Sequence, residues 1–276
     1  MLPLPDSLIW AVLALAVLLC LARRRIPGLF LLGIALLGAF WLDRITPLAL
    51  TVSVAGLLLA WRTPALPQPW RGMALALVMV WAIALTLHLV PGFDNLRVLD
   101  RVQASPASVP FTLYLNLDKP LIFFGLLLAW PTLLGPGGPL RWRPLALLLL
   151  PLAALLIAAW QLDALKPEIG LPHWWWLFAF NNLFFTCVAE EALFRGFIQQ
   201  AITTRSRAWA GICIASLLFG AAHLAGGPLL ALFATLAGAC YGLAFQLSGR
   251  LGVAILIHFL FNFAHLALFT YPLASR

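Results

Sequence analysis

Ionisable side chains are scarce in the long apolar runs of this chain, and those that occur there are of types that carry acid–base chemistry. The chain has only three glutamates, and two of them, Glu190 and Glu191, are adjacent inside the apolar run NNLFFTCVAEEALFRGFIQQ. A carboxylate that is removed from water becomes a stronger base and can take a proton from a bound water. Polar groups in such runs are costly, so they usually mark a functional site.

Helical spacing separates the roles of the two glutamates. Residues four apart share a face, so Glu191 and Arg195 can pair and neutralise each other. Glu190 points about 100° away on a regular helix, and it forms a second polar stripe with Asn182 and Thr186. The alternative is an ion network that only stabilises helix packing. Two carboxylates and one guanidinium would leave such a network with an unbalanced negative charge.

Two further apolar runs carry a histidine with a partner four residues away. The segment Phe219-Gly-Ala-Ala-His223 has small residues between the two rings, which allow close helix approach. The segment His258-Phe-Leu-Phe-Asn262 places a histidine and an asparagine on one face, and His265 continues that stripe. Taken singly, His223 could be a satisfied core residue, and the His258–Asn262 pair could form interhelical hydrogen bonds.

The distance of these residues along their helices from the nearest basic loop favours a shared site over separate structural roles. Glu190 and His223 each lie roughly 20 Å along a helix from the loop at residues 205–207, at 1.5 Å per residue. His258 and Asn262 lie roughly 12–18 Å from Arg250, in a loop on the same side. Independent structural bonds give no reason for this agreement, whereas a common reaction centre does.

The elements that must position these residues are transmembrane helices. The 276 residues are 63% hydrophobic and 9% charged, with a mean hydropathy of +1.01, whereas a soluble domain has about 25% charged residues. The chain contains ten continuous apolar runs, whose lengths are close to the roughly 20 residues that a membrane-spanning helix needs. They lie near residues 7–22, 27–42, 45–61, 73–91, 121–135, 144–162, 175–200, 208–225, 228–247 and 251–271. We therefore predict an all-α, polytopic transmembrane helical bundle with about 8–10 spans.

The longest polar connection, at residues 92–120, suggests a division into two parts. Residues 1–120 would be N-terminal transmembrane helices of unassigned role. Residues 121–276 would be the part that carries chemistry, with its motifs within 175–270. No basic segment precedes the apolar stretch at 8–22, so we expect a retained first span and not a cleaved signal peptide. The four cysteines all lie in apolar runs and are predicted to be small buried residues.

The basic residues behind the net charge of +8 are spread over alternate loops. This distribution follows the positive-inside rule and places those loops in the cytoplasm; it excludes nucleic acid as a partner because no basic patch forms. The basic loops contain Arg23–Arg25, Arg62 with Arg71, Arg141 with Arg143, Arg205 with Arg207, and Arg250. The reactive centre would then lie in the outer half of the bilayer, since Gly226 follows His223 by only three residues.

Together, the three motifs EExxxR, FxxxH and HxxxN resemble the CPBP family (CAAX protease and bacteriocin-processing) of intramembrane proteases, related to the CAAX-processing endopeptidase. They stand here as Glu190-Glu191-Ala-Leu-Phe-Arg195, Phe219-Gly-Ala-Ala-His223 and His258-Phe-Leu-Phe-Asn262. The resemblance covers about residues 175–270, and the first five or six spans show no motif of the family.

The resemblance implies a glutamic intramembrane endopeptidase that cuts a membrane-anchored protein or peptide in the lipid bilayer. Glu190 would be the general base, His223 would help to hold the water, and His258 and Asn262 would donate hydrogen bonds to the oxyanion. Three further residues would not touch the substrate but would hold these four in position: Glu191, Arg195 and Phe219. The protein is expected to be a multi-pass protein of the cell membrane, in particular a bacterial plasma membrane.

Other functions of the same residues remain open at this point. Glu190, His223 and His258 could hold a catalytic zinc ion. We favour a mechanism without metal or other cofactor because there is no HExxH helix and because Asn262 suits an oxyanion better than zinc. A non-catalytic membrane chaperone or immunity scaffold would be expected to lose a motif residue. A transporter with a proton-coupling Glu190–Glu191 pair would be expected to show half-repeats and broken helices.

Overall fold

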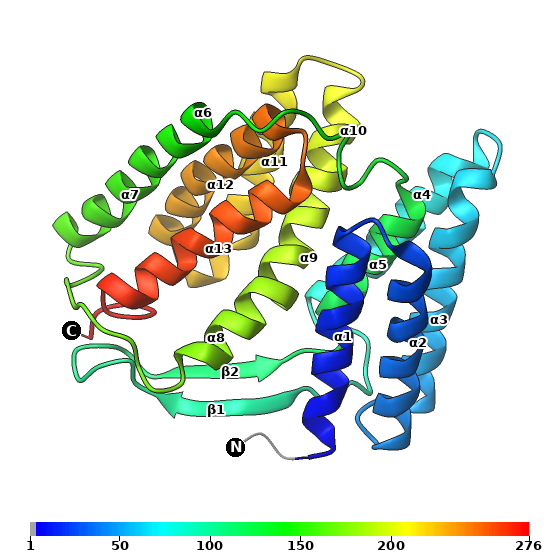
Figure 1. The fold of residues 1–276 in the computed structure, drawn as a ribbon, viewed down its shortest axis with the longest axis horizontal. Coiled ribbons are helices and arrows are strands. Elements are labelled where there is room, and N and C mark those ends of the chain that lie inside the picture. The colour runs from blue at the N-terminus through cyan, green and yellow to red at the C-terminus, as the bar shows by residue number, and fades with distance from the viewer. Residues whose placement is uncertain (1–3, 276) are drawn as a thin grey trace. The chain divides into compact units, whose positions relative to one another are not determined.

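The computed structural model describes residues 4–275, and these form helices joined by loops together with one pair of strands (Figure 1). Each of the ten predicted apolar runs contains a helix. In chain order these are α1 Asp6–Leu21, α2 Arg25–Trp41, α3 Pro47–Arg62, α4 Trp70–Thr86, α5 Lys119–Ala129, the pair α6 Trp142–Leu147 and α7 Leu149–Gln161, the long helix Trp175–Thr203, α11 Ala208–Ala222, α12 Pro228–Ser248 and α13 Leu251–Leu268. The prediction of an all-α helical bundle is confirmed.

Five of these helices are long and apolar enough to cross a membrane: Pro47–Ala65, Trp142–Gln161, Trp175–Thr203, Pro228–Ser248 and Leu251–Leu268. The other five are apolar helices of 10–17 residues. A helix satisfies its backbone hydrogen bonds internally, which is what the interior of a bilayer demands of a spanning segment. Length and composition of these helices therefore indicate a membrane protein.

Proline and glycine define where several of these helices begin and end. Pro47 opens α3, and the Thr46 hydroxyl accepts a hydrogen bond from the backbone N–H of Ala49 at 3.3 Å, which caps the first turn. Pro228 opens α12 directly after Gly227. The same helix ends at Gly249, whose φ of +61° is the left-handed conformation that glycine adopts without strain.

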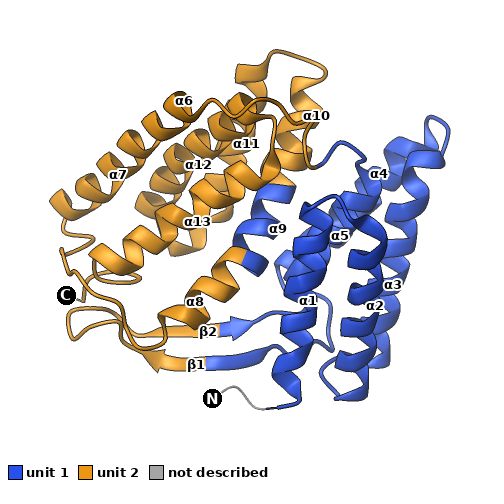
Figure 2. Ribbon diagram, viewed as in Figure 1, with its two compact units in different colours: residues 1–98, 114–133, 184–192 blue, residues 99–113, 134–183, 193–276 orange. Residues whose placement is uncertain are grey.

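The chain divides into two compact units, which Figure 2 colours separately. Unit 1 consists of residues 1–98, 114–133 and 184–192, and unit 2 of residues 99–113, 134–183 and 193–276. Each unit is made of several segments grouped by contact. The functional division at residue 120 stays a prediction.

In unit 1, α1 packs along α2, and α5 packs against α3 and α4. The short helix α5 is apolar on all sides and almost wholly buried, with Leu121, Phe123 and Leu127 at 0% exposure. Its start is fixed by Asp118, which accepts a hydrogen bond from the backbone N–H of Lys119 at 2.9 Å. The α5 helix therefore forms much of the interior of this unit.

The segment at 92–120 contains the main departure from the predicted elements. It holds the strands β1 Leu96–Val102 and β2 Phe111–Leu115, which pair in a two-stranded sheet and run in opposite directions (Figure 1). The sequence led us to expect only a polar connection. The charged residues in LRVLDRV obscure its short alternation of apolar side chains, of which only Leu99 is buried.

In unit 2, α12 packs against α11, α13, α6 and α7, so it is the helix that the others surround. The predicted burial of the cysteines is confirmed for Cys20, Cys187 and Cys240, but it is wrong for Cys213, which is exposed on α11. That position faces outward because Gly211 and Ala215, on the other side of α11, make the buried contacts.

Candidate functional site

The helix that carries the two glutamates is irregular around them. It runs from Trp175 to Thr203, but only α8 Trp175–Asn181, α9 Val188–Glu191 and α10 Gln200–Thr203 are α-helical. The intervening stretches, Asn182–Cys187 and Ala192–Gln199, are π-helical. π-Helical turns are rare and frequent at functional sites. Glu190 and Glu191 therefore occupy a single α-helical turn between two such stretches.

This irregularity changes the spacing on which the sequence argument relied. A regular α-helix would align Asn182, Thr186 and Glu190, whereas i→i+5 hydrogen bonding rotates the face between the first two positions. Glu191 is fully buried at 0% exposure, and Glu190 is half-buried. Both belong to unit 1, in which α9 packs against α5. The other predicted site residues belong to unit 2.

Arg195 belongs to unit 2 and is fully buried, at 0% exposure. Its Nη2 donates a hydrogen bond to the backbone carbonyl of Gly238 on α12 at 2.9 Å. Its guanidinium carbon lies 4.6 Å from the ring centroid of Phe219 and 5.3 Å from that of Tyr241. Contacts of a guanidinium with aromatic faces and with a carbonyl oxygen both offset the loss of hydration. The predicted supporting residues Arg195 and Phe219 are thus in contact.

Two glycines on α12 make room for this arrangement. A Cβ at Gly238 would lie 2.8 Å from Arg195 Nη2, and one at Gly242 would lie 2.8 Å from Gln199 Oε1. Gln199 repeats the Arg195 contact one turn later, because its Nε2 donates to the Gly242 carbonyl at 3.0 Å. Small residues four apart on one helix allow another helix to come close. The missing side chains of Gly238 and Gly242 therefore leave the space that the Arg195 and Gln199 side chains occupy.

His223 is the first residue after α11, and its ring is anchored to the end of that helix. Its Nδ1 lies 2.8 Å from the backbone oxygen of Phe219. A carbonyl oxygen can only accept, so Nδ1 carries the proton of this hydrogen bond and Nε2 of the neutral ring is an acceptor. The ring also packs against the side chain of Phe219, with centroids 4.6 Å apart.

His258 packs against the same phenylalanine from α13. The residue is 4% exposed, and its ring centroid lies 5.7 Å from that of Phe219 with the planes at 88°. Its face is stacked on Tyr241, with centroids 4.4 Å apart and planes within 14° of parallel. Phe219 therefore contacts both predicted catalytic histidines as well as Arg195.

Asn262 lies one turn beyond His258 on α13. Its Nδ2 donates a hydrogen bond to Oδ1 of the buried Asn182 at 3.3 Å. His265, which extends the same stripe in the sequence, lies 3.1 Å through Nε2 from the carbonyl of Thr270 near the end of the chain. His265 is thus engaged in holding the C-terminal segment.

Two residues of this arrangement, Tyr241 and Asn182, were missed as site residues by the sequence argument. Asn182 did stand out as part of the polar stripe before Glu190. Tyr241 is one of only three tyrosines in the chain, and it lies between Gly238 and Gly242 in an apolar run. That combination of a phenol and close-packing glycines was the available signal.

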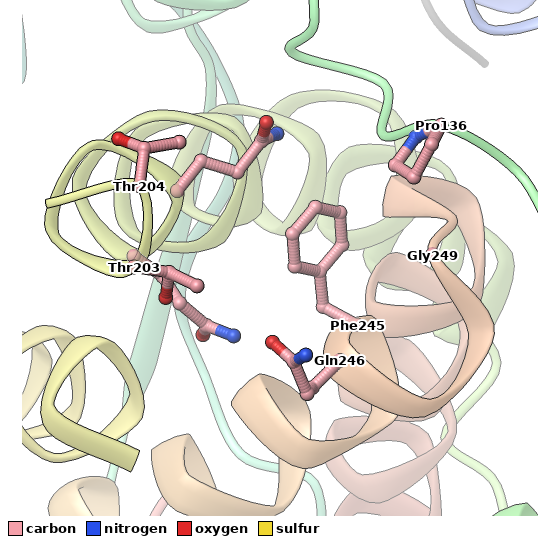
Figure 3. A pocket seen from close by; sticks show the side chains of 8 residues that line it. Pro136, Thr203, Thr204, Phe245, Gln246 and Gly249 are labelled. Atoms are coloured by element: carbon pink, nitrogen blue, oxygen red, sulfur yellow. The ribbon is translucent and has the colours of Figure 1, made fainter. Parts of the chain in front are cut away.

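A cavity of about 280 Å³ lies elsewhere in unit 2, beside the ends of α10 and α12 (Figure 3). Neutral side chains line it, and Figure 3 shows Phe245 and Gln246 directed toward the hollow between the helices. The lining residues are Pro136, Gln199, Gln200, Thr203, Thr204, Phe245, Gln246 and Gly249. None of the predicted catalytic residues is among them. Within residues 4–275, no group of three or more His, Cys, Asp or Glu side chains is arranged to hold a metal ion.

Residues 172–264 match the family model of type II CAAX prenyl endopeptidases, described as Rce1-like. These residues are similar to that family, and we call them the Rce1-like segment. The Rce1-like segment contains all seven predicted site residues, and it runs from just before α8 to near the end of α13. Comparison with curated proteins and with solved structures gave no match.

The resemblance drawn from the three motifs is thus confirmed. The matched family is one of type II CAAX prenyl endopeptidases, so the match indicates a protease.

Proposed function

We propose that this Rce1-like protein is a multi-pass intramembrane endopeptidase of the cell membrane, in a bacterium the plasma membrane. Its substrate would be a protein or peptide held in the bilayer and cut in or next to its membrane-anchored segment. The observation that carries the proposal is the packing of His223 and His258 against one buried ring, Phe219, inside the Rce1-like segment. Two separate structural histidines would have no reason to share it.

In the proposed reaction, Glu190 takes a proton from a water molecule, and the oxygen of that water attacks the carbonyl carbon of the scissile peptide bond. The carbonyl oxygen becomes an oxyanion. When the C–N bond breaks, Glu190 returns the proton to the leaving nitrogen, which gives a new carboxylate and a new amine. General-base catalysis of this kind contributes about 10²–10⁴-fold.

His223 is suited to hold the attacking water. Because its Nδ1–H is engaged by the Phe219 carbonyl, the neutral ring offers Nε2 as an acceptor for a water O–H. This anchoring also fixes the direction of the Nε2 lone pair relative to α11. The hydrogen bond to the Phe219 carbonyl therefore supports the role proposed for His223.

His258 and Asn262 are the proposed donors to the oxyanion. The stack on Tyr241 restricts the plane of the His258 ring, and the hydrogen bond to Asn182 turns the Asn262 amide so that its nitrogen lies toward Asn182. An amide nitrogen carries two hydrogens, so one group can donate to two acceptors. Loss of one preorganised oxyanion donor typically costs about 10²–10³-fold in kcat.

Orientation narrows the substrate class. If the basic loops lie in the cytoplasm, Glu190 and His223 lie in the outer half of the bilayer, since a hydrocarbon core is about 30 Å thick and both are roughly 20 Å from the 205–207 loop. The proposal therefore favours an exported protein with a membrane-anchoring or sorting segment. A prenylated cytosolic tail would have to reach past the midplane.

The experiment compares the protein termini in membranes and medium of cells that contain wild-type protein, Glu190→Gln or Glu168→Gln. Glu168 is the matched control, because it is the only other glutamate and lies outside the apolar runs. We expect a set of new termini in wild-type and Glu168→Gln cells that is absent from Glu190→Gln cells with equal protein levels. Identical termini in all three would overturn the proposal.

A further inference from the structure

Tyr241 makes a close, nearly parallel ring stack with His258, one of the proposed catalytic residues. It lies within α12 and is 1% exposed. Its stack on His258 is nearly parallel, at 14° and 4.4 Å, whereas its contacts with Phe219 and Phe261 are edge-on at 6.1 and 6.4 Å. One face of the phenol ring therefore lies flat against the imidazole.

The position of Tyr241 is itself fixed from α12. Gly238, one turn earlier on the same helix, accepts the hydrogen bond from Arg195, whose guanidinium carbon lies 5.3 Å from the Tyr241 centroid. Gly242, the next residue along the chain, receives the hydrogen bond from Gln199. Tyr241 thus lies in a stretch of α12 that two hydrogen bonds, from Arg195 and Gln199, hold to the helix carrying those residues.

An imidazole held only by its backbone could turn about its last side-chain torsion, because torsions of this type have broad minima. A flat ring stacked on its face removes this freedom and leaves the ring N–H directions in one plane. Hydrogen-bond donors act best when the N–H points within about 30° of the acceptor. The Tyr241–His258 stack therefore restricts the directions in which the His258 N–H can point.

We propose that Tyr241 is a positioning residue that aligns the His258 imidazole with the oxyanion. This inference rests on the donor role proposed for His258 and assigns to Tyr241 the task of holding that donor in plane. The ring face carries the effect and the hydroxyl does not, so Tyr241→Phe should preserve it. Tyr241→Leu, which keeps an apolar side chain but no flat face, should remove it.

Kinetics on the full-length protein in lipid nanodiscs test the catalytic part, with a substrate identified from the cellular termini. Tyr241→Leu is expected to lower kcat by about 10–100-fold with KM changed less than about threefold, since small misplacement of a catalytic group costs up to about 10²-fold. Tyr241→Phe should stay within about threefold of wild type. Phe178→Leu is the control, because Phe178 is an equally buried ring that packs on Tyr271 in the same unit.

NMR of the histidine rings tests the positioning without any substrate. The chain has five histidines, and the His258 signals are those lost in His258→Gln. The Tyr241 ring current should shift these signals upfield in wild type and Tyr241→Phe, and the shift should vanish in Tyr241→Leu. Where the leucine variant does not accumulate, Tyr241→Met replaces it, since methionine fills irregular gaps.

Unchanged His258 signals in Tyr241→Leu, or altered signals with kcat unchanged, would overturn the inference. Failure of the proposed function has a different signature. Glu190→Gln would then cleave as fast as wild type, while the NMR result would still decide whether Tyr241 orders His258.

Discussion

A substitution at Gly238 perturbs the proposed site without replacing any of the proposed catalytic residues. In Gly238→Ala the new methyl group would lie 2.8 Å from Arg195 Nη2 and 3.1 Å from Phe219 Cδ1. Phe219 is the ring against which His223 and His258 both pack. A shift of Phe219 should therefore be transmitted to both histidines.

The expected magnitude follows from two opposing terms. Inserting a methyl group into a packed interior costs about 1–3 kcal/mol, and replacing a mid-helix glycine by alanine returns about 1 kcal/mol of helix propensity. The free energy of unfolding should thus fall by about 0–2 kcal/mol, a small change in stability. Activity should fall much further, by at least about tenfold, because catalysis responds to displacements well below 1 Å.

The assay combines thermal unfolding, followed by the fluorescence of the 12 tryptophans, with the rate of substrate cleavage. Gly33→Ala is the matched control, since Gly33 lies within α2 and a Cβ there would meet nothing within 4 Å. The control should keep wild-type activity and a Tm equal to or above wild type. Wild-type activity in Gly238→Ala would refute the idea that Phe219 holds the rings of His223 and His258 in position.

Three further outcomes are expected. If Glu191 and Arg195 pair as their spacing predicts, Glu191→Ala should lower the amount of folded protein, since removing one partner of a buried ion pair costs about 3–5 kcal/mol. Changing Glu191 to Gln and Arg195 to Met together should then restore more than either single change, and additive losses would argue against the pair. Protein purified in strong chelator should keep its activity with less than about one zinc per molecule by elemental analysis; stoichiometric zinc whose removal reversibly stops cleavage would favour the zinc site of Glu190, His223 and His258. In a background without the native cysteines, a membrane-impermeant maleimide on intact cells should label Gly226→Cys and spare Ser206→Cys, and the opposite pattern would turn the site toward the cytoplasm.

The helices were predictable because the bilayer imposes a simple rule on sequence. A continuous apolar run must satisfy its own backbone hydrogen bonds, so each of the ten runs contains a helix. The hairpin at 92–120 escaped because its strands are short and mix charged with apolar residues. No comparable rule connects a polar loop with strand pairing.

The site was predictable in its residue types and only partly in its geometry. Spacing of four placed Phe219 with His223 correctly, since α11 is a regular helix up to Ala222. The π-helical stretches on either side of Glu190 were not predictable, because a change from i→i+4 to i→i+5 bonding leaves no mark in apolar periodicity. The Tyr241–His258 stack depends on how α12 meets α13, which the sequence of neither helix specifies.

The role of Glu190 is the central claim, and single-turnover cleavage by purified protein in nanodiscs tests it most directly. Wild-type protein and Glu168→Gln should cleave an identified substrate at the same rate, and mass spectrometry in H₂¹⁸O should find the heavy oxygen in the new C-terminal carboxylate. Glu190→Gln should be at least about 10²-fold slower, since it cannot accept the proton of water. Cleavage by Glu190→Gln at the wild-type rate would contradict the account.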